Sequence, residues 1–146
     1  MHKIKLIYTW FIHALFFLWP DVPIIMRLRG FLYSFAMKKC GSNFQVSHSA
    51  LLNTLEMITV GDNVYIANYS SLLANGEITI GNNVLTGPNV VSSGNHIVQN
   101  GVLLKESRNQ AVIIGENSWI SANCTIVGGG FLPEQSLLLA QYGREK

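Results

Sequence analysis

His96 is the residue of this chain that we consider first for acid–base chemistry. It closes the segment Ser93-Gly94-Asn95-His96, which lies in the longest interval between copies of a repeated motif. The pKa of an imidazole lies near neutrality, so the ring can take the proton from a hydroxyl or amine nucleophile at working pH. A histidine in a loop can equally have no function. The role of His96 must therefore be judged from the structural elements that position it.

A metal centre and a nucleic-acid interface are not expected. Zinc sites need several closely spaced His, Cys or carboxylate ligands, and no histidine follows His96. Cys40 and Cys124 form no CxxC pair, and we interpret them as reduced, core-facing thiols of a cytoplasmic protein. The formal net charge is +2 without any run of Lys or Arg, which argues against nucleic acid as a partner.

A Gly-x-Asn motif recurs four times and predicts a solenoid. It begins at Gly41, Gly61, Gly81 and Gly115, so the intervals are 20, 20 and 34 residues. A fixed period near 20 residues is typical of repeat architectures, and the long interval indicates a loop inserted into one coil. We place this loop within residues 94–110, where His96 lies.

Aliphatic residues also recur at every sixth position. The series are Val60, Ile66 and Leu72; Ile114, Ile120 and Ile126; and, with polar members, Ile80, Thr86 and Ser92. A helical period of 3.6 does not fit this spacing, whereas a short strand plus a corner does, with three such units in each triangular coil. Residues two positions earlier, such as Val90, are expected to point inward as well. Corners require residues that tolerate left-handed backbone, and we assign this role to both Gly and Asn.

We divide the chain into three parts. Residues 1–39 form an apolar helical segment that is interrupted by prolines, residues 40–130 form the β-helix, and residues 131–146 form an atypical tail without six-residue periodicity. Residues 6–19 contain no Asp, Glu, Lys or Arg and are too few to span a bilayer. Two interpretations of them stay open: a helix docked on the solenoid or a neighbouring subunit, or a helix lying peripherally in a membrane interface.

Four segments carry a resemblance to a known family. ITVGDNVYI, ITIGNNVLTGPNVV, SGNH and VIIGENSWISANCTIV resemble the hexapeptide-repeat acyltransferases, in particular maltose/galactoside O-acetyltransferases and relatives that acetylate bacterial surface polysaccharides. The resemblance implies an all-β solenoid, a left-handed parallel β-helix, that assembles as a homotrimer. It also implies transfer of an acetyl group from acetyl-CoA to a sugar hydroxyl, as in lipopolysaccharide or other surface-glycan biosynthesis.

The resemblance assigns roles to individual residues. His96 matches the family's catalytic histidine and is expected to act as the general base. Trp119, Ser121 and Ala122 match the stretch that lines the donor groove, where acetyl-CoA would bind between two subunits. No metal is implied.

The residues for the acceptor depart from the family pattern. Asn68 and Asn75 each lie one place beyond a sugar-contacting position of the family, and we expect them to bind the acceptor together with Asn95. This shift argues against maltose or galactoside and favours a glycan or sugar intermediate of a cell-surface polysaccharide. The choice between O-acetylation and N-acetylation of an amino sugar stays open.

The C-terminal sequence leaves two functions open. The family continues for one or two further coils, whereas this chain reads GFLPEQSLLLAQYGREK after Gly129. The first function is an active cytoplasmic acetyltransferase, with or without association with the inner face of the membrane. The alternative is a trimeric scaffold derived from the family, truncated near Gly130 and impaired in donor binding.

Overall fold

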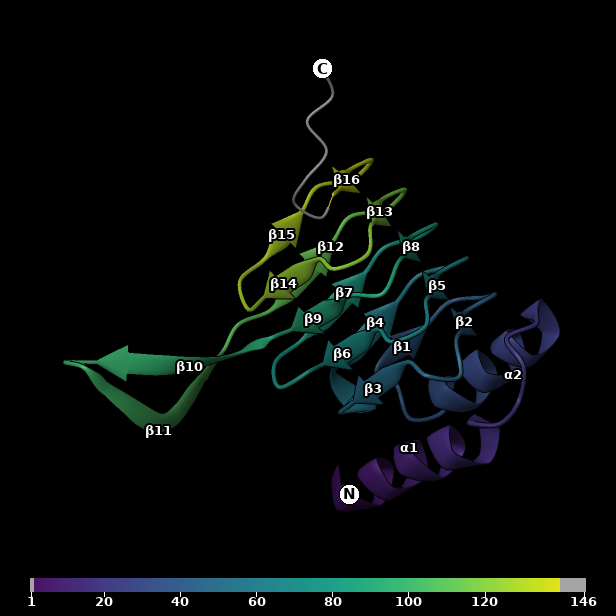
Figure 1. The fold of residues 1–146 in the computed structure, drawn as a ribbon, viewed down its shortest axis with the longest axis horizontal. Coiled ribbons are helices and arrows are strands. Elements are labelled where there is room, and N and C mark those ends of the chain that lie inside the picture. Colours follow the sequence, from purple (N-terminus) through teal and green to yellow (C-terminus); the bar gives the residue numbers. More distant parts are fainter. Residues whose placement is uncertain (1, 140–146) are drawn as a thin grey trace.

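The computed structural model describes residues 2–139. Two helices, α1 (His2–Phe16) and α2 (Pro23–Ser34), precede a stack of coils whose short strands form three sheets (Figure 1). Neighbouring strands within these sheets are parallel. The prediction of a parallel β-helix after an N-terminal helical segment is therefore confirmed.

The three faces of the coil are named sheets A, B and C. Sheet A contains β1 (Lys39–Cys40), β4 (Ile58–Val60), β7 (Ile78–Ile80), β12 (Val112–Ile114) and β15 (Phe131–Leu132). Sheet B contains β2 (Gln45–Val46), β5 (Tyr65–Ile66), β8 (Leu85–Thr86), β13 (Trp119–Ile120) and β16 (Leu137–Leu138). Sheet C contains β3 (Leu51–Asn53), β6 (Ser71–Leu73), β9 (Val90–Ser92) and β14 (Thr125–Val127). The remaining elements are a 3₁₀ turn (Leu55–Met57) and a hairpin of β10 (Gly94–Gln99) and β11 (Val102–Asn109).

The corners are named after the sheets that they connect. The A/B corners are residues 41–44, 61–64, 81–84, 115–118 and 133–136. The B/C corners are residues 47–50, 67–70, 87–89 and 121–124. The C/A corners are residues 54–57, 74–77, 93–111 and 128–130.

Equivalent aliphatic side chains stack along the axis of the coil. Ile58, Ile78 and Val112 are in register and fully buried, as are Leu52, Leu72 and Val91 on sheet C. On sheet B the buried row includes the polar Thr86. Each inward side chain is covered above and below by its equivalents, so the core extends for as long as the repeat does.

Asn and Gly have different tasks at the A/B corners. Asn43, Asn63, Asn83 and Asn117 adopt φ values of 55–56°, the left-handed region that Asn tolerates. The motif glycines are required for a different reason: a Cβ on Gly115 would lie 2.3 Å from the Glu134 backbone nitrogen. The sequence-based assignment of left-handed backbone to both residue types is therefore correct for these Asn residues and for Gly129 of a C/A corner, which has φ 85°. It is wrong for the motif glycines, which allow the close approach of neighbouring coils.

Sheet C departs from the six-residue spacing at β9. The corner 87–89 has three residues where the other B/C corners have four. As a result Val91, in register with Leu72, occupies the core position that we had assigned to Ser92. Val90 is 36% exposed, and Asn89 takes the inward place before it. The inward assignments of Ser92 and Val90 were wrong because a shortened corner moves every later residue by one position.

The β-helix continues beyond residue 130, which we had set as its end. β15 and β16 pair with β12 and β13, and Gln135 repeats the left-handed corner with φ 56°. Leu132 and Leu138 continue the six-residue series of Ile126, so the periodicity persists although no Gly-x-Asn marks it. Residues 140–146 of the expected tail lie outside the described residues.

The helices cover the N-terminal end of the stack. Arg29 of α2 is fully buried, and its guanidinium donates hydrogen bonds to the Val46 carbonyl and to Asp21 Oδ1, the latter at 3.1 Å. Asp21 Oδ2 lies 2.8 Å from His48 Nδ1 on the first coil. Burial raises the pKa of the Asp21 carboxyl, but hydrogen bonds from His48 and Arg29 outweigh it and hold this pKa below its usual value. One carboxylate thus fixes the linker between the helices to the β-helix.

Candidate active site

His96 lies on a hairpin that projects from a C/A corner. β10 and β11 pair antiparallel, with a bulge between His96 and Val98, and occupy most of the interval where we expected an inserted loop. The turn uses Asn100 and Gly101, both with positive φ. Figure 1 shows this hairpin, in green, leaving the stack of coils sideways. The His96 side chain is exposed on this arm, where a substrate can reach it.

A buried serine holds the base of the arm. Ser93 Oγ accepts a hydrogen bond from the Gly76 amide at 2.7 Å and donates one to the Gly76 carbonyl at 2.9 Å. The Ser93 carbonyl accepts from the Gln110 amide at 2.9 Å, which joins the two ends of the arm. Ser93 was not among the site residues predicted from the sequence. The sequence does contain a clue, because Ser93 is equivalent to Ala74 of the preceding coil. No arm leaves the coil at Ala74, so no side-chain hydroxyl is required there.

Two of the predicted acceptor residues gather beside His96. Asn95 Nδ2 donates to the Gly128 carbonyl of the next coil at 3.2 Å. The Asn75 amide lies directly against Gly94, because a Cβ on that glycine would be 2.4 Å from Asn75 Nδ2. Asn75, Asn95 and His96 therefore share one corner and present polar groups for a hydroxylated ligand.

The third predicted acceptor residue is not there. Asn68 belongs to a B/C corner, and its Oδ1 accepts from Ser49 Oγ at 3.2 Å. This corner lies at the opposite edge of sheet C from Asn75. Within one chain the structure does not bring Asn68 together with His96.

The predicted donor residues lie on sheet B and at the B/C corner. Trp119, on β13, is 47% exposed and is in register with Leu85 and Leu137. Ser121 Oγ lies 3.5 Å from Cys124 Sγ, and Ala122 is exposed. A neighbouring groove of about 340 Å³ is lined by Tyr69, Pro88, Asn89, Val90, Asn123, Cys124 and Thr125.

The site residues thus form two groups at opposite edges of sheet C. Ala122 precedes β14 and Gly128 follows it, so this strand separates the donor group from the corner of His96.

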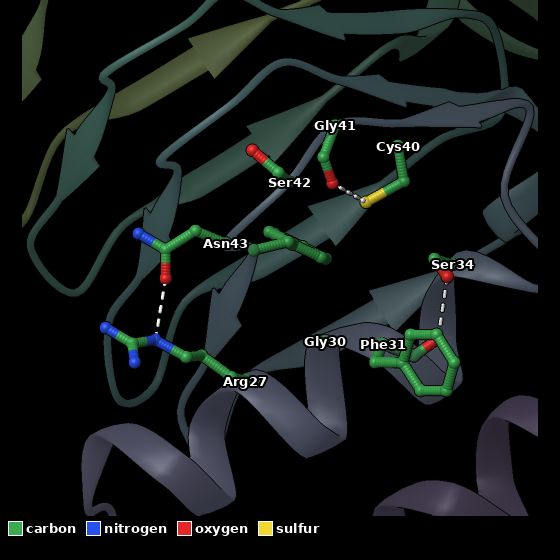
Figure 2. A pocket seen from close by; sticks show the side chains of 9 residues that line it. Arg27, Gly30, Phe31, Ser34, Cys40, Gly41, Ser42 and Asn43 are labelled. Atoms are coloured by element: carbon green, nitrogen blue, oxygen red, sulfur yellow. Dashed lines mark hydrogen bonds between the residues drawn. The ribbon is translucent and has the colours of Figure 1, made fainter.

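A different cavity lies at the N-terminal end of the stack (Figure 2). It encloses about 460 Å³ and is lined by Arg27, Gly30, Phe31, Ser34, Cys40, Gly41, Ser42, Asn43 and Phe44. Several of its polar groups already have partners: Arg27 Nε donates to Asn43 Oδ1 at 2.7 Å, and Ser34 Oγ donates to a backbone carbonyl. Burial and the nearby Asp62 charge raise the pKa of the Cys40 thiol to about 11, so it is not a nucleophile at neutral pH. No predicted site residue lines this cavity.

The described part of the chain offers no ready metal site. Within residues 2–139, no group of three or more His, Cys, Asp or Glu side chains could hold a metal ion.

The sequence has curated relatives. It is 25% identical over 129 residues to WcaF of Escherichia coli K12, a protein assigned to colanic acid biosynthesis as an acetyltransferase. The aligned region covers 88% of this chain and 69% of WcaF, and the WcaF of Shigella flexneri matches equally. No family model matches the chain.

Solved structures share the fold. A hexapeptide-repeat acetyltransferase of Vibrio cholerae, crystallised with acetyl-CoA, superposes with a TM-score of 0.77 at 18% identity and covers 94% of this chain and 74% of its own. A second structure of the Vibrio protein gives a TM-score of 0.71 at 16% identity, covering 92% of this chain and 85% of its own. The matches fit a left-handed coil preceded by helices. The chain therefore shares the fold of these hexapeptide-repeat proteins, and its sequence is similar to that of WcaF.

Proposed function

We propose that this protein is an acetyltransferase that moves an acetyl group from acetyl-CoA to a sugar hydroxyl of a surface polysaccharide or its precursor. The observation that carries this proposal is the exposed His96 on an arm that departs from the one interrupted coil. The relationship to WcaF supports acetyl transfer and a glycan pathway, and the fold shared with an acetyl-CoA-bound protein supports the donor.

In the proposed reaction His96 acts as general base. The imidazole takes the proton of the acceptor hydroxyl while its oxygen attacks the thioester carbonyl carbon. The new C–O bond forms and the C–S bond breaks, and the imidazolium returns its proton to the leaving CoA thiolate. A backbone N–H that faces the thioester oxygen would stabilise the developing negative charge. Asn75 and Asn95 would position the acceptor.

We propose a homotrimer in which each site is shared by two subunits. Support comes from the separation of the two groups of site residues by sheet C. The C/A edge of one triangular prism would bring His96 to the B/C edge of its neighbour, beside Trp119, Ser121 and Ala122. Asn68 would then belong to the neighbour's contribution to the same site.

We place the enzyme in the cytoplasm, where acetyl-CoA is available. The free thiols of Cys40 and Cys124 support a reducing compartment. Among residues 2–139, neither helix has the length and hydropathy required to cross a bilayer.

The test combines donor binding with turnover. Isothermal titration with acetyl-CoA measures binding, and mass spectrometry of a panel of sugars and amino sugars measures transfer. The His96→Ala protein should bind acetyl-CoA as the parent does and lose roughly 10²–10⁴ in kcat, the usual contribution of a general base. His13→Ala serves as the control because it removes a histidine of α1 far from this corner.

Two results would overturn the proposal. A protein that does not bind acetyl-CoA would be a scaffold instead of an enzyme. Full turnover in His96→Ala would show that another group takes the proton. Acetylated amino groups in place of hydroxyls would correct the acceptor while leaving the role of His96 intact.

A further inference from the structure

Helix α1 is apolar on both of its faces. Its inner face packs on the β-helix through Thr9, Ile12 and Phe16, which are buried. Its outer face carries large apolar side chains that remain exposed; they are Ile4 (71% exposed), Ile7 (66%), Phe11 (57%) and Leu15 (49%), and Leu18 (90%), just beyond the end of the helix, continues their spacing. Their spacing of three and four residues places them in one stripe. A helix that is apolar all round is normally covered on all sides.

Helix α2 adds a second apolar stripe. Ile24, Leu28, Phe31 and Phe35 follow the same three- and four-residue spacing, and each is at least 45% exposed. The two helices contact each other, with Tyr8 Oη donating to the Leu32 carbonyl at 2.7 Å. Figure 1 shows both helices at the N-terminal end of the stack, away from the C-terminal coils. Contiguous exposed apolar surface of this extent marks an interaction site.

Charge is distributed very unevenly between this end and the rest of the chain. Residues 1–55 contain six Lys or Arg and one acid, Asp21, which is bonded to Arg29 and His48. Residues 56–139 contain two Lys or Arg and six acids. The overall net charge of +2 hides this separation. The apolar stripes therefore belong to a strongly basic unit on an acidic β-helix.

We propose that α1 and α2 form a surface that binds peripherally to a bilayer containing anionic lipids. The apolar stripes would enter the headgroup boundary, while Lys3, Lys5, Arg27 and Lys39 would lie at the level of the lipid phosphates. Trp10 and Trp19 are 68% and 48% exposed and suit the interfacial depth that indole rings prefer. At 15 residues α1 is too short to span the bilayer and would lie in its surface.

The charges favour this occupant over a second copy of the chain. Two copies joined through these faces would bring two basic units together and would gain no opposite charge. An anionic bilayer supplies both the apolar phase and the negative charge. This proposal is independent of acetyl transfer, and binding in this manner would hold the β-helix at the membrane surface through one end of its stack.

The test is co-sedimentation of the full chain with vesicles. One set contains phosphatidylcholine alone, and the other contains phosphatidylcholine with phosphatidylglycerol at a 7:3 ratio. We expect binding to the anionic vesicles that weakens as salt screens the charges, and much weaker binding to the neutral vesicles. The Ile7→Glu/Phe11→Glu variant should reduce the partition coefficient by roughly tenfold or more, since it places two charges in the apolar stripe.

The matched control is Val98→Glu/Phe131→Glu. It makes the same chemical change at side chains of similar exposure, 68% and 69%, on the arm and on sheet A. The control should bind anionic vesicles as the parent does. A second measurement needs no charge variant: in a Trp119→Phe background, the emission of Trp10 and Trp19 should shift to the blue when anionic vesicles are added.

Three outcomes would overturn the proposal. The first is an unmodified chain that neither sediments with anionic vesicles nor shows the blue shift. The second is an equal loss of binding in the control variant. The third is that the parent does not bind vesicles while the Ile7→Glu/Phe11→Glu variant has a lower molar mass than the parent by light scattering. That result would mean that the surface binds a second copy of the chain.

Discussion

The A/B corners have the same structure in successive coils, whereas the C/A corners of the same coils differ from one another. At the A/B corners an Asn ladder runs along the stack, with Asn63 Nδ2 donating to Asn83 Oδ1 and Asn83 Nδ2 donating to Asn117 Oδ1, each at 3.0 Å. The backbone amide of each Asn also donates to the coil before it. At these corners the Asn side chains therefore bond to one another from coil to coil.

The C/A corner does not repeat. Its four segments include a 3₁₀ turn, a short loop, the hairpin arm and a glycine run, and the predicted acid–base and acceptor groups Asn75, Asn95 and His96 gather there. Where every coil makes the same contacts, side chains are committed to the fold. The residues to which we assign chemistry lie where one coil departs from the pattern.

The largest stability effect is expected from a methyl group at an A/B glycine. In Gly81→Ala the new Cβ would lie 2.7 Å from the Glu116 backbone nitrogen and 2.9 Å from its Cα, so two coils must separate. We expect a loss of about 3 kcal/mol in the free energy of unfolding, measured by chemical denaturation. Gly101→Ala is the control at the arm, where nothing lies within 4 Å, and should cost about 1 kcal/mol for its positive φ. Equal stability of Gly81→Ala and the parent would refute the tight approach of coils.

The Asn ladder should show the next effect. Asn83→Ala loses both amide hydrogen bonds and forces an alanine into left-handed backbone, for a total of about 2 kcal/mol. Asn83→Gly loses the same bonds but adopts this backbone freely, so it should be the more stable variant by about 1 kcal/mol. Comparing the thermal melts of the two variants separates the loss of the hydrogen bonds from the cost of the left-handed backbone. An alanine variant as stable as the glycine variant would show that the positive φ is not what selects Asn.

Loss of the Ser93 hydroxyl should affect the C/A corner in both stability and activity. Ser93→Ala leaves the buried Gly76 amide without its partner, which costs about 1–2 kcal/mol. Because the arm is anchored here, kcat for acetyl transfer should fall while the affinity for acetyl-CoA is retained. Ser92→Ala, which removes only a long bond to the Gly94 carbonyl at 3.3 Å, is the control. Unchanged kcat in Ser93→Ala would mean that the arm is positioned by other contacts.

The smallest expected effect is a stabilisation. Asn89 is 4% exposed, and neither its Oδ1 nor its Nδ2 has a partner among the described residues. The equivalent inward places hold Ser70 and Cys124, which are smaller. Asn89→Ser should therefore raise the free energy of unfolding by about 1 kcal/mol, since a desolvated amide is removed. A lower melting temperature would instead indicate that the amide makes a hydrogen bond in solution.

Much of the fold could be predicted from the sequence because each coil repeats the same packing of inward aliphatic side chains on their equivalents in the next coil. Val60, Ile66 and Leu72 follow from a spacing that any single coil reveals. The shortened corner before Val91 could not be predicted, because Val90, Val91 and Ser92 are all compatible with a strand and only the register across coils selects among them. The continuation through Leu132 was missed because we followed the Gly-x-Asn motif and not the aliphatic spacing.

The candidate site was predictable in part. His96 was singled out through its place in the long interval, and the structure places it, exposed, on the hairpin of β10 and β11. The separation of Asn68 from Asn75 was not foreseen, because sequence proximity says nothing about which edge of a triangular coil a corner occupies. Ser93 was missed because a buried hydroxyl resembles any small core residue until its partner, the Gly76 amide, is known.

The most direct measurement compares His96→Ala with Asn83→Ala in both kcat and melting temperature. We predict that His96→Ala retains the parental melting temperature and loses at least roughly 100-fold in kcat, since the ring is exposed and acts only on the substrate proton. Asn83→Ala should melt earlier while its kcat below the melting range stays within about twofold of the parent, since the ladder acts only on stability. Full turnover in His96→Ala would contradict the division between a repeated corner that holds the fold and an interrupted corner that carries the chemistry.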